Sequence, residues 1–185
     1  MDAQERRMTH RVTGEWVGLK RQQPFPSIDF LHPRNFSVDW DCCILVRCLA
    51  EATEPAEDAL EFEFVGKGFR RDAPLCTAGE RLASVPPGSL LSLSMPVVPK
   101  LFERRTAIIH NGVQPWGRNG AVYFRVIAVP FGDSAGDLRY ALGALSHKLS
   151  GEHLRAGQAM AEFLEYRDGS WLRIDAAPQP ALASA

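Results

Sequence analysis

Few side chains in this sequence combine the type and spacing that catalysis or metal binding requires. His110 lies beside Ile108 and Ile109 in an apolar stretch, from which it could bind a haem or a metal ion. A single histidine in a strand more often packs in the core or lies at the surface, and we favour that interpretation. His147 and His153 fit no metal-binding spacing and are expected at the surface. We predict no metal site.

The cysteines are close together in the sequence but do not form a recognisable motif. Cys42, Cys43 and Cys48 fall in one predicted strand, and Cys76 follows later. Neighbouring residues of a strand point to opposite faces, which is poor geometry for a disulfide. We therefore expect buried, apolar thiols in a reducing compartment. Cys42 is the best candidate for a flavin adduct or a redox switch, an alternative that stays open.

One carboxylate pair could support acid–base chemistry. Asp39 and Asp41 project to the same side of an extended segment. Two residues apart at the entry to a strand, such carboxylates are more often solvated. The sequence also lacks a strand-to-helix nucleophile turn and a glycine-rich phosphate loop. We predict no catalytic residue, and the cofactor stays unknown.

Length and composition restrict the class of protein. The 185 residues, of which 45% are hydrophobic and 23% charged, suffice for one domain with extensions. The 21 Lys and Arg residues balance 22 Asp and Glu, so the overall charge does not favour binding to nucleic acid or to a membrane surface. No apolar run approaches the ~20 residues of a membrane-spanning helix, and the charged start MDAQERRMTHR does not resemble a secretory signal. The expected location is the cytoplasm.

Two longer helices are predicted from apolar spacing. The first covers residues 4–23, with its apolar stripe formed by Met8, Val12, Trp16 and Leu19. The second is predicted over residues 89–104, with Ser89 as its N-cap. Because Pro96 and Pro99 lie inside this segment, the helix either begins late or is kinked. Between residues 70 and 89, prolines and glycines allow only short helical turns.

Five strands are predicted from alternating apolar and polar residues, and together they define the fold class. They lie at 42–49, from 60 to the glycines at 66 and 68, and at 105–113, 121–130 and 138–147. Five antiparallel strands with helices in the middle of the chain make an α+β protein. The hairpin at 120–148 should be the centre of the sheet, facing the helical crossover. The candidate ligand-pocket residues on that side are Phe62, Phe64, Leu93, Val97, Leu101, Phe124 and Leu142.

Several apolar residues are predicted to form an interface between copies of the chain. Tyr123 and Ile127 lie on the second face of the fourth strand, which the opening helix, a second subunit or the C-terminal segment must cover. A homodimer is therefore expected, with the opening helix, including Trp16 and Leu19, as its main element. Trp116 and Arg118 lie at a hairpin tip, where the tryptophan either contacts a partner or folds back on the sheet.

The domain boundaries follow from these elements. Residues 1–34 are the N-terminal helix and linker, 35–148 the main domain, and 149–185 a C-terminal extension. In the extension, apolar residues first recur at helical spacing (Leu154, Met160, Phe163 and Leu164) and then form a short extended piece (Trp171, Leu172 and Ile174). The extension either packs on the domain or docks on a partner. Its last stretch, AAPQPALASA, should be disordered.

Four stretches of the sequence resemble a PAS domain, of the single-domain PAS-type family found widely in alphaproteobacteria. These are WVGLKRQQPFPSIDFLHP, FEFVGKGFRR, PPGSLLSLSMPVVPKLFERRTAIIHNGV and YFRVIAVPFGDSAGDLRYALGALSHK, within residues 10–148. The resemblance implies a PAS-like five-stranded antiparallel sheet with helices over one face and an N-terminal helix. It also implies a pocket that takes a ligand in some members and is filled by side chains in others.

The function that follows from this resemblance is sensory or regulatory. We expect a non-enzymatic module of signal transduction that acts through a regulatory protein partner and, as an open possibility, a small-molecule ligand. The alternative is a small enzyme that uses the PAS-like cavity as an active site. A third interpretation is a scaffold whose pocket is filled. An active site would need acids, bases or a metal converging in the cavity, whereas the predicted lining is apolar.

Overall fold

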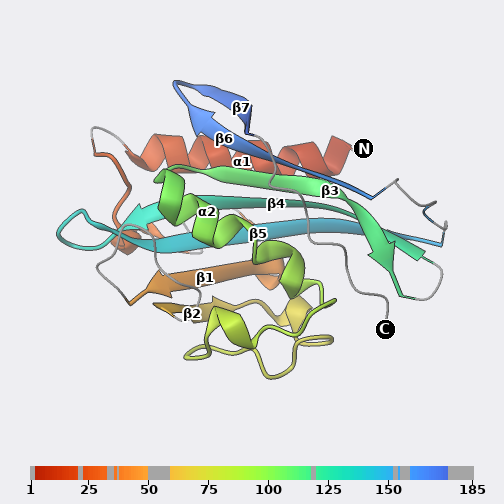
Figure 1. Cartoon of the computed structure of the whole chain (residues 1–185). Helices are drawn as coiled ribbons and strands as arrows, with labels where there is room; N and C mark the ends of the chain where they lie inside the picture. The colour runs from red at the N-terminus through yellow and green to blue at the C-terminus, as the bar shows by residue number, and fades with distance from the viewer. Residues whose placement is uncertain are drawn as a thin grey trace.

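The chain folds around one large antiparallel sheet, seen in Figure 1. The computed structural model describes residues 3–20, 23–32, 36, 38–49, 59–117, 120–151, 154 and 159–174. In this part of the chain the strand order is β2-β1-β5-β4-β3-β6-β7. The strands are β1 (Cys43–Cys48), β2 (Leu60–Val65), β3 (Ile108–Trp116), β4 (Gly120–Gly132), β5 (Leu138–Ser150), β6 (Met160–Arg167) and β7 (Ser170–Ile174).

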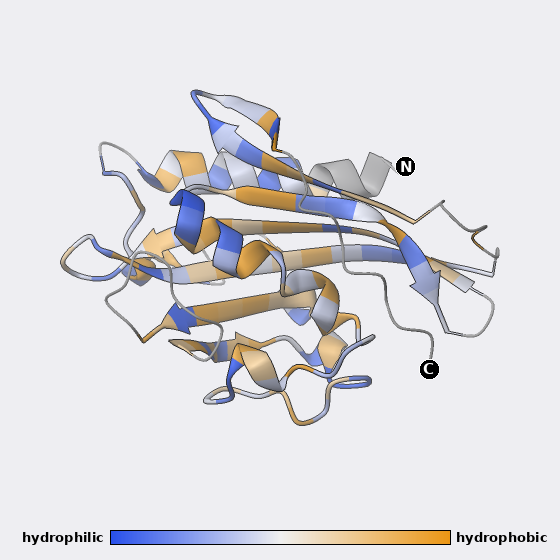
Figure 2. Ribbon diagram, in the orientation of Figure 1, coloured by the Kyte–Doolittle hydropathy of each residue, from blue (hydrophilic) through white to orange (hydrophobic). Residues whose placement is uncertain are grey.

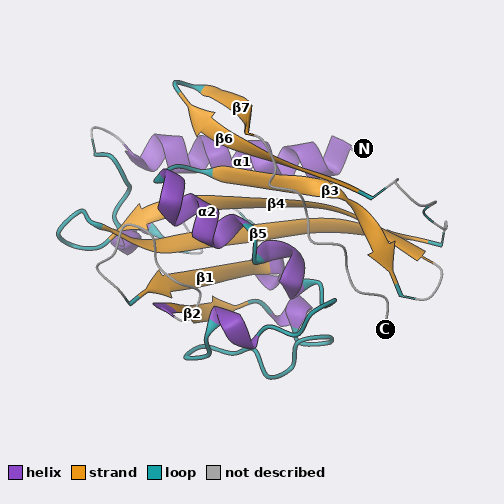
Figure 3. Cartoon of the chain, viewed as in Figure 1, coloured by secondary structure: helices purple, strands orange, loops and turns teal. Residues whose placement is uncertain are grey.

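Two α-helices and several short 3-10 helices accompany this sheet in the described segments. The α-helices are α1 (Ala3–Lys20) and α2 (Val97–Arg104). The 3-10 helices are η1 (Ile28–Phe30), η2 (Trp40–Cys42), η4 (Lys67–Phe69), η5 (Leu82–Ser84) and η6 (Leu91–Ser94). Figure 3 shows that helix and irregular loop dominate the connection from β2 to β3. The predicted α+β class with an antiparallel sheet is confirmed. None of the described helices is both long enough and apolar enough to cross a bilayer.

The sheet has an apolar residue set on each of its two faces, and each set has its own cover. On the inner face, Val46, Phe62 and Phe124 pack with residues of η4, η5, η6 and α2. On the opposite, outer face, Ile127 and Leu142 pack with α1. In Figure 1, α2 lies in front of the sheet and α1 behind it. Figure 2 shows the hydrophobic stretch along β1 and the mixed hydropathy of α2, which is typical of a helix with one side on a core.

The predicted centre of the sheet is confirmed. β5 and β4 pair along most of their length, from Ala121 opposite Ser150 to Gly132 opposite Leu138, and both are interior strands. The opening helix has the predicted buried stripe, since Met8, Val12 and Trp16 are all buried against the outer face. Pro96 decides the start of the second helix. It is the N-cap of α2 in place of the predicted Ser89, so the helix begins late, which is one of the two predicted outcomes.

The prediction of five strands is wrong, because the sheet has seven. Of the residues that we expected at helical spacing, Met160, Phe163 and Leu164 instead lie in β6, which pairs with β3. The extended piece predicted at Trp171, Leu172 and Ile174 is confirmed as β7, which pairs with β6. The turn between them is Asp168-Gly169, and both residues have positive φ angles of 50° and 83°. This is the backbone of a tight two-residue hairpin turn, for which Asp-Gly is a preferred sequence. The predicted boundary at residue 149 therefore falls inside β5, and the described part of the extension belongs to the sheet.

Gly66, directly after β2, lies in close contact with the backbone of η2 at this end of the sheet. A Cβ atom there would overlap the backbone carbonyl oxygens of Trp40 and Asp41, which belong to η2. Gly66→Ala is therefore expected to lower the free energy of unfolding by about 2 kcal/mol. Urea unfolding measures the change. Gly14→Ala, where the new methyl group meets nothing within 4 Å, should instead stabilise α1 slightly. Equal effects at the two glycines would contradict this account.

Candidate functional site

The predicted pocket region lies between the inner face of the sheet and the helical segment, which we define as the part of the chain from η4 to α2. Side chains fill this region. Phe62, Val97, Leu101 and Phe124 are each no more than 2% exposed, and Leu93 is 4% exposed. All five belong to one apolar cluster. The structure thus brings five of the seven pocket candidates together, but as a packed core.

Phe64 does not face this interior. Its side chain is 37% exposed and packs edge-on against Trp40, with the ring centroids 5.9 Å apart. The cause is a register shift between β1 and β2, where Leu45 pairs with Phe64 but Val46 pairs with Phe62. The extra residue in β2 reverses the alternation, as a β-bulge does, so that Val65 takes the inward position. The assignment of Phe64 to the pocket is wrong for this reason.

Leu142 also lies on the opposite side from the predicted one. It is fully buried, but its cluster is the one beneath α1 on the outer face. The neighbours Ala141 and Leu145 take the inner face of β5. The run ALGAL at 141–145 is apolar on both sides, and alternation alone therefore could not assign its faces.

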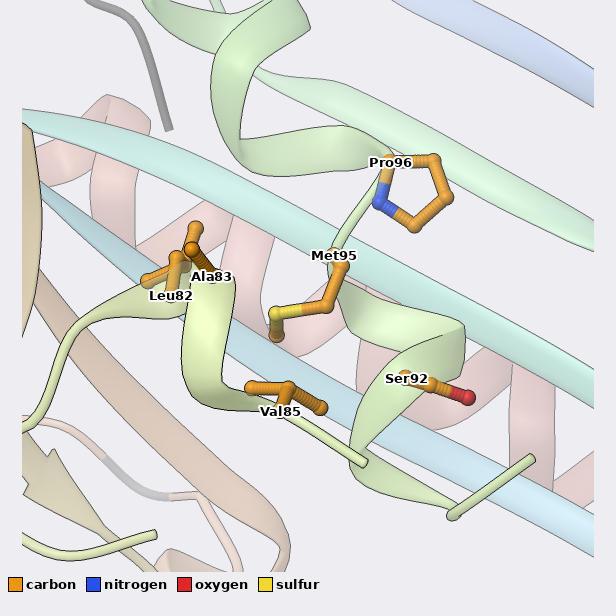
Figure 4. Close-up of a pocket in the computed structure, with 6 residues that line it drawn as sticks. All are labelled: Leu82, Ala83, Val85, Ser92, Met95 and Pro96. Atoms are coloured by element: carbon orange, nitrogen blue, oxygen red, sulfur yellow. The ribbon is translucent and has the colours of Figure 1, made fainter. Parts of the chain in front are cut away.

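A groove with a mainly apolar lining lies on the helical segment. Its volume is about 370 Å³, and its lining residues are Leu82, Ala83, Val85, Ser92, Met95 and Pro96. Figure 4 shows the Met95 side chain between η5 and η6, directed toward Ala83 and Val85. The one hydroxyl in the lining, that of Ser92, donates a hydrogen bond of 2.6 Å to the Ser89 carbonyl oxygen. The groove therefore offers mainly apolar contact, because the donor of its one hydroxyl is already used.

Sequence reasoning missed this groove. We expected short helical turns at 70–89 and a longer helix after them, and the groove forms where these two parts meet. The available signal was the set of apolar residues at 82–95 interrupted by Pro86, Pro87 and Gly88. Such interruptions stop one continuous helix from burying all its apolar residues on a single face. The local geometry of η5 and η6 could not be derived from that signal.

His110 is a packed core residue. It is 2% exposed, and its ring stacks on Phe163 at 4.3 Å between centroids and meets Phe124 edge-on at 4.8 Å. Its Nδ1 lies 3.3 Å from the Leu93 carbonyl oxygen, which accepts the hydrogen bond when Nδ1 carries the proton. Burial and, to a smaller extent, the nearby charge of Lys100 lower the pKa of His110 to about 4, against the opposing effect of this hydrogen bond. At neutral pH the ring is therefore uncharged.

No metal centre is assembled around this histidine. Among the residues that the structure describes, no three His, Cys, Asp or Glu side chains are grouped to hold a metal ion. Its Nε2 is buried and has no hydrogen-bond partner within the described segments. His147 is partly exposed on β5, as expected, whereas His153 lies outside the described residues.

The cysteines and the aspartates at the start of β1 have structural contacts. Burial raises the pKa of the Cys42 thiol, and the carboxylates of Asp39 and Asp41 raise it further. Burial also raises the pKa of Cys43, whose thiol donates to the Asp39 carbonyl oxygen at 3.2 Å. Thiols in this state are poor nucleophiles, which argues against the redox alternative for Cys42.

The two carboxylates do not act as a pair. Asp39 caps η2 by accepting a hydrogen bond from the backbone N–H of Asp41 at 3.1 Å. The Asp41 carboxylate lies 3.1 Å from Lys67 Nζ, in an exposed ion pair. Each aspartate thus serves the local turn, and the alternative of acid–base chemistry gains no support from their geometry.

The predicted interface residues divide into buried and exposed ones. Trp16 is 1% exposed and Ile127 is fully buried, because α1 covers the outer face of its own sheet. Leu19 packs partly against the same cluster, and Trp116 folds back against the inner-face cluster, as one of its two predicted alternatives stated. Tyr123 is 40% exposed. Arg118 lies outside the described residues.

The chain itself covers most of both apolar faces, which removes this argument for a second subunit except at the exposed Tyr123. Of the three covers considered for the fourth strand, the opening helix is the main one in the structure, and Tyr166 and Trp171 of the C-terminal segment pack against the same cluster. Comparison with known proteins adds no assignment: no protein-family model matches the chain, and neither does any curated protein or solved structure. Its function has to be argued from its own surfaces and side chains.

Proposed function

We propose that this chain is a cytoplasmic, non-enzymatic regulatory module of the PAS type, which acts in signal transduction by contact with another protein. The observation that carries the proposal is the packed, apolar interior between the inner face and the helical segment. The first five strands, in the order β2-β1-β5-β4-β3 with helices between β2 and β3, are compatible with a PAS-like arrangement. The two further strands, β6 and β7, are an addition to it.

The ionisable groups support a binding role better than a catalytic one. His110 is enclosed by two phenylalanine rings, and Cys43 is buried with its thiol on a backbone carbonyl. The carboxylates at the start of β1 hold a turn and a surface ion pair. Catalysis requires such groups to converge on a space that a substrate can enter. The open groove is lined by other, mainly apolar residues.

We propose the groove between η5 and η6 as the contact surface. Its lining offers the thioether of Met95 and the aliphatic side chains of Leu82 and Val85. A flexible methionine adapts to differently shaped apolar groups, which suits recognition of a protein segment. Since the Ser92 hydroxyl already donates to the Ser89 carbonyl oxygen just before η6, the occupant proposed here is a bulky apolar side chain of the partner. A small apolar ligand is the second mode of the same surface.

A peptide-display selection against the purified protein tests this proposal. Enriched peptides should share a bulky apolar residue, and Ala83→Trp, which fills the groove, should weaken their binding at least about tenfold. Thr77→Trp is the matched control, because it adds the same indole at an exposed position outside the groove lining. Titration by fluorescence anisotropy measures both affinities. Failure to enrich such peptides, or equal affinities for the two variants, would refute the groove as the contact surface.

A further inference from the structure

The two edges of the sheet differ in how they are protected. At β2, the backbone N–H of Phe62 donates to the Glu80 carbonyl oxygen at 2.9 Å, and that of Gly79 donates to the Phe62 carbonyl oxygen at 2.8 Å. Glu61 and Arg81 form a further bridge there. At the other edge, β7 pairs with β6 on one side, and no described residue pairs with its outer side. An open edge is a template for another strand.

The hairpin turn determines which groups this edge offers. Arg167 pairs with Ser170 directly beside the two-residue turn, and such flanking pairs are hydrogen-bonded to each other. Hydrogen-bonded and non-hydrogen-bonded pairs alternate along an antiparallel ladder. The N–H and C=O groups of Ser170, Leu172 and Ile174 are therefore directed toward β6. Those of Trp171 and Arg173 are directed outward.

The sequence of β7 is complementary to itself in one antiparallel register. We propose that two copies of the chain pair edge to edge through β7, about a two-fold axis at Leu172. In this register Trp171 of each copy lies opposite Arg173 of the other. The outward N–H and C=O groups of both residues then hydrogen-bond across the interface. The guanidinium then lies beside an indole ring on the same face, a favourable cation–π combination.

The side chains at the axis support the same register. Leu172 is 46% exposed and would meet its own copy, which removes apolar surface from water. A register centred on Arg173 would place two guanidinium groups opposite each other, and one centred on Trp171 would place Gly169 of the turn opposite Arg173. Neither of these two registers pairs Trp171 with Arg173 across the interface.

An aromatic row connects this edge with the opening helix. Trp171 meets the ring of Tyr166 at 5.3 Å, and Tyr166 meets that of Trp16 in α1 at 5.9 Å. The paired edge at β7 would thus be connected with α1 by a continuous row of ring contacts. The β7 edge is a surface for the homodimer expected of a PAS-type module, and only this expectation of a homodimer rests on the proposed function. The groove variant Ala83→Trp lies on η5, so either proposal can fail without the other.

Sedimentation equilibrium from micromolar to millimolar concentration tests the edge pairing. The wild-type mass should rise from 20.5 kDa toward twice that value. Leu172→Lys and Leu172→Asp each place like charges at the axis and should weaken dimerisation at least about tenfold. An equimolar mixture of the two should recover the dimer, because lysine then faces aspartate. This recovery also shows that both variants fold.

The matched control is Leu149→Lys, which changes a leucine of similar exposure, 54%, on β5, where it pairs with β4 away from the β7 edge. It should dimerise like the wild type. A wild-type mass that stays at 20.5 kDa at every concentration overturns the inference. So does a Leu172→Lys variant that dimerises normally, or a mixture that stays monomeric. Wild-type monomers that instead bind an unrelated strand-forming peptide at β7 would assign the edge to a different partner.

Discussion

Replacing Trp16 with alanine is expected to lower the free energy of unfolding by about 4 kcal/mol, in the range found when large buried side chains are truncated. The side chain is 1% exposed beneath the outer face. Its Nε1 donates a hydrogen bond of 2.8 Å to the Pro130 carbonyl oxygen on β4. The truncation removes this donor and leaves a cavity between α1, β4 and Tyr166. Equilibrium urea unfolding followed by circular dichroism measures the loss.

Two further variants separate the contributions. Trp16→Phe keeps a ring in the cavity but leaves the Pro130 carbonyl oxygen without its donor, so it should cost about 2 kcal/mol. Val17→Ala changes the next residue of α1, which is 40% exposed, and should stay within about 0.5 kcal/mol of the wild type. If Trp16→Ala costs no more than Val17→Ala, α1 is not docked on its own sheet. The tryptophan would then be available for an interface, as the sequence alone had led us to expect.

The elements that the sequence predicts well are those with one apolar face. The opening helix has a single stripe that includes Val12 and Trp16, and both residues are buried. In the third and fourth strands, predicted at 105–113 and 121–130, the structure has β3 and β4 within three residues of those bounds. Alternation over several residues specifies a strand whatever its neighbours are.

Face assignment fails where both sides of a strand are apolar or where the register shifts. Leu142 lies in a run that is apolar on both faces, and Phe64 follows a bulge whose origin is the pairing of two strands distant in sequence. In each case the decisive contact is tertiary. No local pattern in residues 60–65 or 141–145 could have supplied it.

The first strand of the C-terminal hairpin and its pairing were missed for a different reason, although the second strand was predicted as an extended piece. Met160, Phe163 and Leu164 fit a helical stripe, but the Asp168-Gly169 pair between two apolar stretches was itself a strong hairpin signal. Gly112 on β3 was a second, hidden determinant. A Cβ atom there would overlap the Met160 carbonyl oxygen, so the glycine allows β6 to lie close to β3. The edge at β7, whose outer side pairs with no described residue, follows directly from this hairpin and could not be foreseen without it.

The stability of the fold should fall by about 3 kcal/mol between pH 7 and pH 4 because of His110 alone. Burial lowers the pKa of this histidine from 6.5 to about 4 in the folded state, so the unfolded chain takes up a proton in this interval that the folded chain does not. The free energy of unfolding therefore decreases as the pH falls from about 6.5 to about 4. It levels off below 4, where the histidine is protonated in both states. A pKa difference of this size corresponds to about 3 kcal/mol.

The contribution of His110 is isolated by difference, because carboxylates also titrate at the low end of this range. His110→Gln keeps polar atoms near the Leu93 carbonyl oxygen but cannot take up the proton, so its urea-unfolding free energy should vary less with pH by about 3 kcal/mol. His147→Gln removes a partly exposed histidine from β5 and controls for the loss of one imidazole. A wild-type pH profile that runs parallel to that of His110→Gln would show that this ring is not held uncharged in the core. A weaker dependence in His110→Gln alone identifies the ring between Phe124 and Phe163 as the group that titrates on unfolding, since proton uptake there requires the packed rings to separate.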